Sequence, residues 1–274
     1  MPELPEVEIA ARNLRKWARG WTIARAHVPR TRVIRGSSPA AVVRALEGRV
    51  IARVDRRGKW LRWTLDDDSR VFSHLGMSGR WVRRTMTDAT ERSQRLRLDL
   101  ARGGLARGAR TTSLRYVDPR MFGRFVVSRD DISEWSSLGP DPLVDGVDEG
   151  VLAGAIGRRK RAIKDVLMDQ TAIAGVGNIL ATESLWRARI DPRTPATSLG
   201  ATQLRAIARA IAWSIERTLA LEEGPELQYV EEPGAPNPFV IYGRGGEPCP
   251  RCRTPLTRAV LGGRATVFCH GCQH

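Results

Sequence analysis

The sequence predicts an α+β fold: an N-terminal helix with a two-sheet β-sandwich, then a small helical domain and a cysteine-rich C-terminal module. Three observations support this prediction. Apolar residues near the N-terminus have helical spacing, most of residues 21–130 alternate in polarity before helical spacing returns near residue 150, and two CxxC pairs close the chain. A chain of 274 residues can bury a core and divide into two domains.

The first predicted helix begins close to the N-terminus. Its apolar face carries Val7, Ala11, Leu14 and Ala18, and charged residues lie opposite. The start of this helix would hold the residues that precede it in a rigid position. The N-terminal residues are therefore candidates for a site that needs fixed geometry.

Pro2 becomes a secondary amine if the initiator Met1 is removed, which a small second residue permits. An α-amino group has a pKa of about 7.7–8, against about 10.4 for Lys, so part of it is unprotonated and nucleophilic near neutral pH. A secondary amine that attacks the anomeric carbon of a sugar can collapse to an iminium. Pro2 is therefore a candidate nucleophile.

Residues 21–130 are expected to form mostly β-strands. Side chains alternate with period two in Trp60–Leu65 and in Arg95–Leu100. An Asp66–Asp68 turn and a Gly103–Gly104 loop follow these runs. Two packed sheets are the expected outcome.

A Pro- and Gly-containing segment, Leu138–Leu143, marks the change to helical periodicity. Beyond it, one apolar stripe has helical spacing from Leu204 to Leu219. Pro, Gly and acidic residues then predict a mobile loop. The expected divisions are an N-terminal domain at 1–131, a linker at 132–149, a helical domain at 150–222, the loop at 223–238 and the cysteine module at 239–274.

The cysteine module predicts one structural Zn²⁺ ion, held by Cys249, Cys252, Cys269 and Cys272. Two tight turns that each present two thiolates complete a tetrahedron, and a reducing compartment favours metal over disulfides. His270 is interpreted as a solvated turn residue, because four cysteines already close the site.

Arg264, Ala265 and Thr266 lie between the two cysteine pairs and are expected at the tip of a two-stranded hairpin. An arginine there could reach a phosphate. An ordinary surface arginine is the alternative interpretation of Arg264.

The net charge is +15, and the excess is almost entirely arginine. This favours a polyanionic partner bound with steep salt dependence, with an arginine-rich soluble surface as the alternative. No apolar stretch approaches the roughly 20 residues of a membrane span, and the N-terminus lacks a cationic apolar leader. We therefore expect a cytosolic protein without a membrane segment.

Two short patterns point to phosphate contacts. Gly175–Asn178 could present helix N-terminal amides and the Asn178 side chain to an anion, although glycines also serve plain helix turns. Lys59 is one of only four lysines in a chain dominated by arginine, which suggests a demand for a compact charge at this position. A solvated strand end is the alternative for Lys59.

Two glycine-bounded segments, His74–Gly79 and Asp118–Gly123, present Met77, Arg120 and Phe122. If a base is flipped out of a duplex, an apolar wedge and a cation that faces the orphaned base would fill the space. Taken singly, Met77 and Phe122 would be interpreted as core residues.

Taken together, the motifs resemble, in order along the whole chain, those of the formamidopyrimidine-DNA glycosylase and endonuclease VIII family. The resemblance implies a β-sandwich domain with an N-terminal helix, then a helix-two-turn-helix domain that ends in a zinc finger, with DNA between the domains. The matching segments are Pro2–Glu8, Gly58–Leu61, His74–Gly79, Asp118–Arg124, Leu138–Leu143, Gly175–Asn178, Tyr242–Cys249 and the cysteine module.

The resemblance also implies roles for individual residues. Pro2 would form the Schiff base, and Glu3 would act as the acid and base that opens the sugar. Lys59 and Arg264 would serve both catalysis and DNA binding. The positions implied to contact DNA are Lys59, His74, Met77, Arg120, Phe122, Lys164, Asn178 and Arg264, among which Met77, Arg120 and Phe122 would fill the vacated stack and Lys164 would lie near the lesion.

One segment departs from the family pattern. Guanine-directed members carry a Thr/Ser-rich segment followed by Arg, Asp and Phe after the long helix, whereas this chain has Glu222–Tyr229. The segments Pro2–Glu8 and Asp118–Arg124 nevertheless favour the formamidopyrimidine branch. We therefore expect a bifunctional glycosylase and AP lyase of base-excision repair that removes oxidised purines, formamidopyrimidines above all.

The expected partner is damaged double-stranded DNA, bound by a monomer in a bacterial-type cytoplasm. Three alternatives stay open at this point: an oxidised-pyrimidine specificity, a paralogue that binds lesions or abasic sites without cutting, and a small-molecule isomerase that uses the Pro2 amine. Intact Pro2 and Glu3 argue against the second, and the charge and cysteine module argue against the third.

Overall fold

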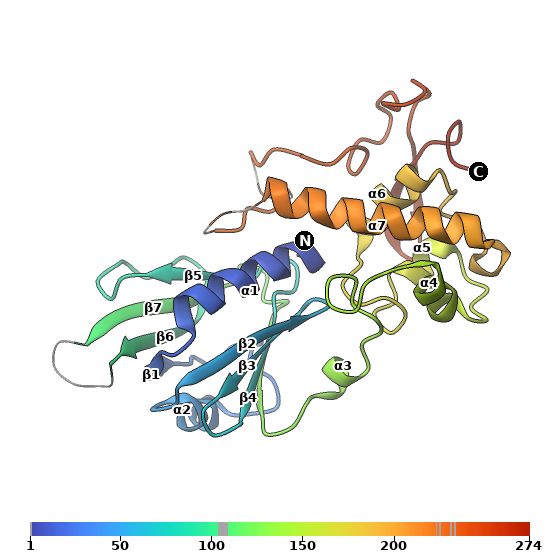
Figure 1. Cartoon of the computed structure of the whole chain (residues 1–274). Helices are drawn as coiled ribbons and strands as arrows, with labels where there is room; N and C mark the ends of the chain where they lie inside the picture. Colours follow the sequence, from blue (N-terminus) through green and yellow to red (C-terminus); the bar gives the residue numbers. More distant parts are fainter. Residues whose placement is uncertain (1, 104–108, 223, 225, 231, 233) are drawn as a thin grey trace. The chain divides into compact units, whose positions relative to one another are not determined.

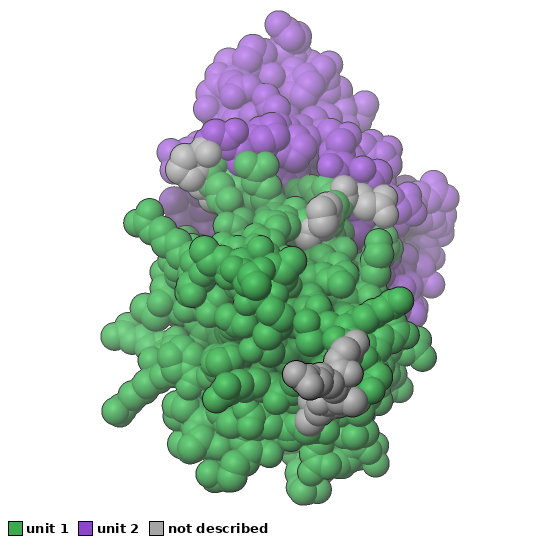
Figure 2. Space-filling view, turned by 90° about the vertical axis from the view of Figure 1, so that its left-hand side faces the viewer, with its two compact units in different colours: residues 1–2, 6–136, 222–232 green, residues 3–5, 137–221, 233–274 purple. Residues whose placement is uncertain are grey.

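The computed structural model describes residues 2–103, 109–222, 224, 226–230, 232 and 234–274 (Figure 1). Met1, Gly104 and four positions of the expected loop, 223, 225, 231 and 233, therefore lie outside the described residues. The chain forms two compact units, coloured separately in Figure 2. Unit 1 contains residues 1–2, 6–136 and 222–232, and unit 2 contains residues 3–5, 137–221 and 233–274.

The expected N-terminal helix is confirmed as α1, Leu4–Ala18. Its apolar face is buried, with Val7, Leu14 and Ala18 fully enclosed. On the other face, the Glu8 carboxylate accepts a hydrogen bond at 2.8 Å from the Nε atom of Arg56, whose side chain is only 1% exposed. This ion pair fixes α1 to the strand that carries Arg56.

The two predicted sheets are present in unit 1, and both are antiparallel. Trp81 joins them, since its ring centroid lies 5.0 Å from that of Trp63 and 6.2 Å from that of Phe125, both in the other sheet. In one sheet the order is β1 (Thr22–His27), β6 (Gln94–Arg102), β7 (Arg110–Val117), β5 (Arg80–Arg84); in the other it is β2 (Ile51–Arg57), β3 (Trp60–Leu65), β4 (Arg70–His74), β8 (Arg124–Ser128).

Among the described residues of 21–130, the β-rich prediction missed one helix, α2, Pro39–Leu46. Ser38 caps it by accepting a hydrogen bond from the Ala41 amide, and Pro39 occupies the first turn. Only Val42 and Leu46 are buried, so the apolar pattern is too short to reveal a helical period. A further short helix, α3, spans Ser133–Ser136.

Unit 2 contains the predicted helical region and the cysteine module. Its helices are α4 (Glu149–Ile156), α5 (Ile163–Leu167), α6 (Asn178–Ala188) and α7 (Ala201–Leu221), with a 3-10 turn η1 at Ala196–Ser198 and the hairpin β9 (Thr257–Leu261) and β10 (Arg264–Phe268). The expected stripe on α7 is buried at Leu204, Ile207, Ile211 and Ile215 in one core cluster. Within the described residues, no helix is both long and apolar enough to cross a membrane.

Candidate active site and nucleic-acid interface

Glu3 lies at the N-terminus of α6. Its Oε1 atom accepts a hydrogen bond from the Ile179 amide at 2.8 Å, and its Oε2 atom accepts from Gly177 at 3.1 Å and Leu180 at 2.9 Å. The residue is 1% exposed. Unsatisfied amides and the helix dipole make a helix N-terminus a site for an anion, and here the carboxylate of Glu3 occupies it.

The backbone fixes Glu3 in this position. The Leu4 amide donates to the Gly175 carbonyl at 3.1 Å, and Leu4 belongs to the core cluster of unit 2. Gly175 has φ of +90°, and a Cβ atom there would lie 2.7 Å from the Leu4 side chain. Glycine is therefore needed at position 175 for close approach to the N-terminal peptide. Pro2, which is buried, directly precedes Glu3 in the chain.

Asn178, the first residue of α6, belongs to a buried network. Its Nδ2 atom donates to the Ala265 carbonyl at 3.0 Å, and its Oδ1 atom accepts from Lys164 Nζ at 2.6 Å. The same Lys164 amine donates to the Thr266 hydroxyl at 2.5 Å. Lys164 is 0% exposed, and burial lowers its pKa to about 8.

Arg264 is exposed and begins β10, paired with Leu261. The hairpin is as predicted, but its turn is Gly262–Gly263, with φ of +52° and +71°. Two consecutive positive φ angles define the tight hairpin turn for which Gly-Gly is favoured, so Ala265 and Thr266 lie in the strand instead of at the tip. The Gly-Gly pair itself was the sequence signal for this turn.

In unit 1, the two glycine-bounded segments are tied together. Tyr116 donates from its hydroxyl to the His74 carbonyl at 3.1 Å, and a Cβ atom on Gly79 or Gly123 would collide with that hydroxyl. Asp118 links the segments a second time. One of its carboxylate oxygens accepts from the Ser78 hydroxyl at 2.7 Å, and the other accepts from the Gly123 amide at 2.8 Å.

These ties hold the three residues expected to fill a vacated base stack. Phe122 is 54% exposed and is therefore not a core residue. The Arg120 guanidinium lies 5.0 Å from the Phe122 ring centroid, and Met77 is half-buried in the adjoining segment. An exposed aromatic ring with a cation above it is suited to insertion between the bases of a duplex.

Replacing Gly123 by Ala is expected to lower the free energy of unfolding by about 1–3 kcal/mol, because the new Cβ would overlap the buried Tyr116 hydroxyl. Urea denaturation followed by tryptophan fluorescence measures this. Gly154→Ala is the control, since nothing lies within 4 Å of its Cβ position in α4, and it should be neutral or stabilising by up to about 1 kcal/mol. Equal stabilities for the two variants would contradict the expectation.

Lys59 and His74 are neighbours in unit 1. Lys59 lies in the two-residue turn between β2 and β3, and Trp60, the next residue, packs its ring 4.9 Å from the His74 ring. The Gly76 amide donates to His74 Nδ1 at 2.9 Å, which places the proton of the neutral ring on Nε2. Burial, then the charges of Lys59 and Arg124, lowers the pKa of His74 to about 4.

The depressed pKa of His74 predicts acid sensitivity. Between about pH 6.5 and 4 the unfolded chain binds a proton at His74 that the folded protein does not, so the free energy of unfolding should fall as the pH decreases through this window. Urea denaturation at pH 7 and pH 4.5 should show a smaller loss for His74→Gln than for the wild type. An equal loss in both proteins would refute the assignment to His74.

The cysteine module has the geometry of a metal site. The four sulfur atoms all lie within 4.8 Å of one another, with 3.9 Å between Cys249 and Cys272 and 3.4 Å between Cys252 and Cys269. Zn–S bonds of about 2.3 Å in a tetrahedron require sulfur atoms about 3.8 Å apart, so the four thiolates fit zinc. His270 Nδ1 instead lies 3.2 Å from the Thr257 hydroxyl.

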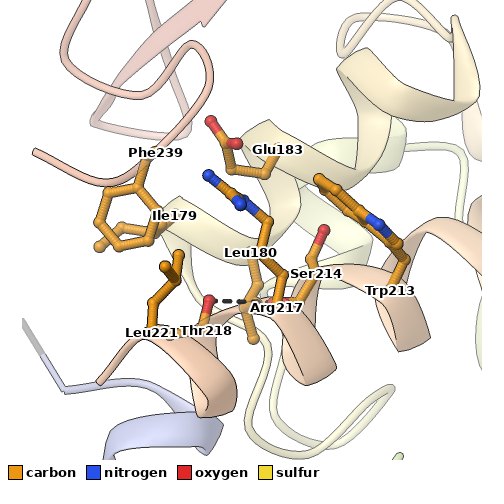
Figure 3. Close-up of a pocket in the computed structure, with 9 residues that line it drawn as sticks. All are labelled: Ile179, Leu180, Glu183, Trp213, Ser214, Arg217, Thr218, Leu221 and Phe239. Atoms are coloured by element: carbon orange, nitrogen blue, oxygen red, sulfur yellow. Dashed lines mark hydrogen bonds between the residues drawn. The ribbon is translucent and has the colours of Figure 1, made fainter. Parts of the chain in front are cut away.

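Glu183 joins this module to α6, a role that sequence reasoning missed. Its carboxylate accepts hydrogen bonds from the amides of Val240, Ile241 and Tyr242 at 2.8–2.9 Å. Figure 3 shows Glu183 beside the small pocket that α6, α7 and Phe239 line. The three amides hold the segment that leads into the cysteine module against α6, and a lone Glu in a helical pattern gave no signal of this.

The described part of the Glu222–Glu232 segment contacts the sandwich of unit 1. Tyr229 is 4% exposed, and its hydroxyl donates to the Gly79 carbonyl at 2.6 Å. Arg80 Nη1 donates to the Leu227 carbonyl at 2.9 Å and to Glu232 at 2.8 Å. The segment in which this chain departs from the family pattern is thus joined to the end of the loop that carries Met77.

Three family models match successive parts of the chain. The Formamidopyrimidine-DNA glycosylase N-terminal domain matches residues 1–125, the Formamidopyrimidine-DNA glycosylase H2TH domain matches residues 138–227, and the zinc finger found in FPG and IleRS matches residues 246–274. The helix-two-turn-helix and zinc-finger parts of the expected fold are thereby confirmed, and with the four-cysteine cluster they confirm one structural zinc ion.

Complete relatives and solved structures agree with these matches. Formamidopyrimidine-DNA glycosylases of Teredinibacter turnerae and of a Nocardioides species are 36% and 39% identical, over 100% of this chain and 100% and 94% of their own. Two Lactococcus lactis Fpg structures, both 28% identical over the whole of both chains, have TM-scores of 0.85 with Fapy-dG DNA and 0.86 with DNA that contains an oxidised pyrimidine. The chain therefore belongs to the formamidopyrimidine-DNA glycosylase family.

Proposed function

We propose that this chain is a DNA glycosylase and AP lyase of base-excision repair that removes oxidised purines, formamidopyrimidines above all, through a Schiff base on Pro2. Family membership supports the enzyme class, because the family consists of glycosylase/AP lyases. The observation that carries the mechanism is the buried carboxylate of Glu3, held by α6 amides directly beside Pro2 in the chain. An acid or base fixed next to an amine nucleophile is what attack at C1′ requires.

In this mechanism the Pro2 nitrogen forms a bond to C1′ and the damaged base leaves with the electrons of the glycosidic bond. Glu3 takes the proton that the attacking Pro2 nitrogen loses and delivers it to the ring oxygen as the sugar opens to the iminium, and it takes protons back in later steps. The resulting iminium acidifies C2′, so the 3′ phosphate and then the 5′ phosphate can be eliminated. A one-nucleotide gap results.

The remaining positions would bind the damaged duplex. Exposed Arg264 and the network that contains Asn178 lie in unit 2, while Lys59 and His74 lie in unit 1, and all four offer donors suited to phosphate oxygens. Met77, Arg120 and Phe122 would occupy the vacated stack. We further propose that the enzyme acts as a monomer in the cytoplasm, and that its domains have the five divisions expected from the sequence.

An oxidised-pyrimidine preference is the second candidate. It is favoured by the unusual Glu222–Tyr229 segment and by the Lactococcus structure in complex with an oxidised-pyrimidine DNA. The two candidates share the same chemistry at Pro2 and differ only in the base that is accepted.

Borohydride trapping on labelled duplexes tests both candidates. The substrates carry 8-oxoguanine, a formamidopyrimidine, an oxidised pyrimidine or a bare abasic site, with an undamaged duplex as control. Adducts strongest on the formamidopyrimidine support the proposal, and adducts strongest on the oxidised pyrimidine support the second candidate. Binding without any adduct, abasic DNA included, would indicate a non-catalytic protein, and wild-type cleavage by both Pro2→Gly and Glu3→Gln would refute the mechanism.

A further inference from the structure

Lys164 is the most deeply buried cation in unit 2 whose partners the structure identifies. Its side chain is 0% exposed, and its amine donates to Asn178 Oδ1 and to Thr266 Oγ1 at 2.6 and 2.5 Å. An ammonium group has three protons, and two of them are committed to protein atoms. A buried Lys with two short hydrogen bonds is well suited to joining structural elements and poorly placed to reach a ligand in solvent.

The two acceptors lie on elements that carry proposed phosphate contacts. Asn178 begins α6 and also donates to the Ala265 carbonyl of β10 at 3.0 Å. The Thr266 hydroxyl donates to the Arg264 carbonyl at 3.1 Å. Lys164 therefore connects α5, the N-terminus of α6 and the strand that begins with Arg264.

We propose that Lys164 is a positioning residue that acts through Thr266 and Asn178 to hold Arg264 and the α6 N-terminus in the geometry that binds the phosphates of damaged DNA. This inference rests on the proposed function and assigns Lys164 an indirect role in place of direct contact with the lesion. Desolvation of the amine, which lowers its pKa to about 8, agrees with burial away from solvent. Asp165, Glu3 and Arg264 are the charged groups that act on it.

The inference makes Thr266→Val the decisive variant, because it removes the hydroxyl that Lys164 and the Arg264 carbonyl share and changes no charge. Affinity of the full-length, zinc-loaded protein for a duplex with a tetrahydrofuran abasic analogue is measured by fluorescence anisotropy at several salt concentrations. The slope of log K against log salt changes by about 0.9 for each phosphate contact. We expect Thr266→Val to make this slope shallower by close to one contact, as Arg264→Ala does.

A double-mutant cycle gives the second criterion. If Lys164 acts through Arg264, Lys164→Met combined with Arg264→Ala should weaken binding little more than the stronger of the two single variants. The exposed Lys16 on α1 provides the control for loss of one positive charge, as Lys16→Met. Two results together would overturn the inference and favour direct contact of Lys164 with DNA. Thr266→Val would keep the wild-type salt slope, and the losses of affinity from Lys164→Met and Arg264→Ala would multiply in the double variant.

Hydrogen–deuterium exchange without DNA separates this inference from the proposed function. Lys164→Met and Thr266→Val should both increase exchange at the amides of 257–268, whether or not the wild type forms a covalent adduct. If no covalent adduct forms but the double-mutant cycle shows the expected coupling between Lys164 and Arg264, only the proposed function is refuted. Unchanged exchange in both variants would defeat the inference, even if the enzyme is active.

Discussion

Replacing Glu3 by Gln is expected to slow removal of a damaged base by about 10²–10⁴-fold, the usual contribution of a positioned acid or base. The change keeps the side-chain volume but leaves one acceptor oxygen where two serve the amides of Gly177, Ile179 and Leu180. At least one of these donors would then face an amide NH₂ group, which costs about 1–3 kcal/mol of stability. Single-turnover excision, measured well below the melting temperature, isolates the chemical effect.

A bare abasic duplex provides the internal comparison for Glu3→Gln. Its sugar already opens to an aldehyde, so the Pro2 amine can form the iminium without departure of a base. We expect the variant to retain covalent trapping on abasic DNA while it loses excision. Glu216→Gln, at an exposed carboxylate of α7, should leave both reactions unchanged. Excision by Glu3→Gln at the wild-type rate would exclude Glu3 as the acid.

Removal of zinc is expected to have the second large effect. Zinc-finger peptides gain about 10–16 kcal/mol from the metal, and here Cys249, Cys269 and Cys272 are themselves part of a buried cluster with Trp186 and Ile241. Chelation, or Cys272→Ser, should therefore unfold the β9–β10 hairpin. Loss of the Arg264 contact should weaken binding to an abasic duplex and make the slope of log K against log salt shallower by about 0.9.

Elemental analysis measures the zinc content of each variant, and anisotropy titrations measure its affinity for the abasic duplex. His270→Ala is the matched control, because His270 lies between two of the cysteines yet lies beside Thr257. It should retain one zinc per chain and wild-type affinity. Loss of zinc in His270→Ala, or full affinity in metal-free protein, would contradict the assignment of the four cysteines as the structural site.

Much of the architecture follows from local patterns. Continuous apolar faces predicted α1 and the stripe on α7, and alternation predicted the two sheets. The sequence did not predict helix α2, because two buried residues are too few to show a helical period. The predicted division into five segments stays a prediction.

The site was only partly accessible from sequence. The cysteine spacing alone predicted the cluster of four sulfurs, since all its geometry is local. Tyr116, Tyr229 and Glu183 carried no signal, because each acts on backbone groups that are distant in sequence: the carbonyls of His74 and Gly79 and the amides of 240–242. The burial of Lys164 was equally unpredictable, since it depends on a partner 102 residues away.

The assignment of Glu3–Pro5 to the helical unit has a consequence for dissecting or recombining this protein. A fragment that starts at residue 137 would lack both the Glu3 carboxylate, which satisfies three α6 amides, and Leu4, which belongs to the unit 2 core. Such a fragment would have a cavity in its hydrophobic core where Leu4 packs, and the three α6 amides would lack their acceptor. Chimaeras between relatives should therefore exchange residues 3–5 together with 137–221 and 233–274, even though more than 130 residues separate the first segment from the second.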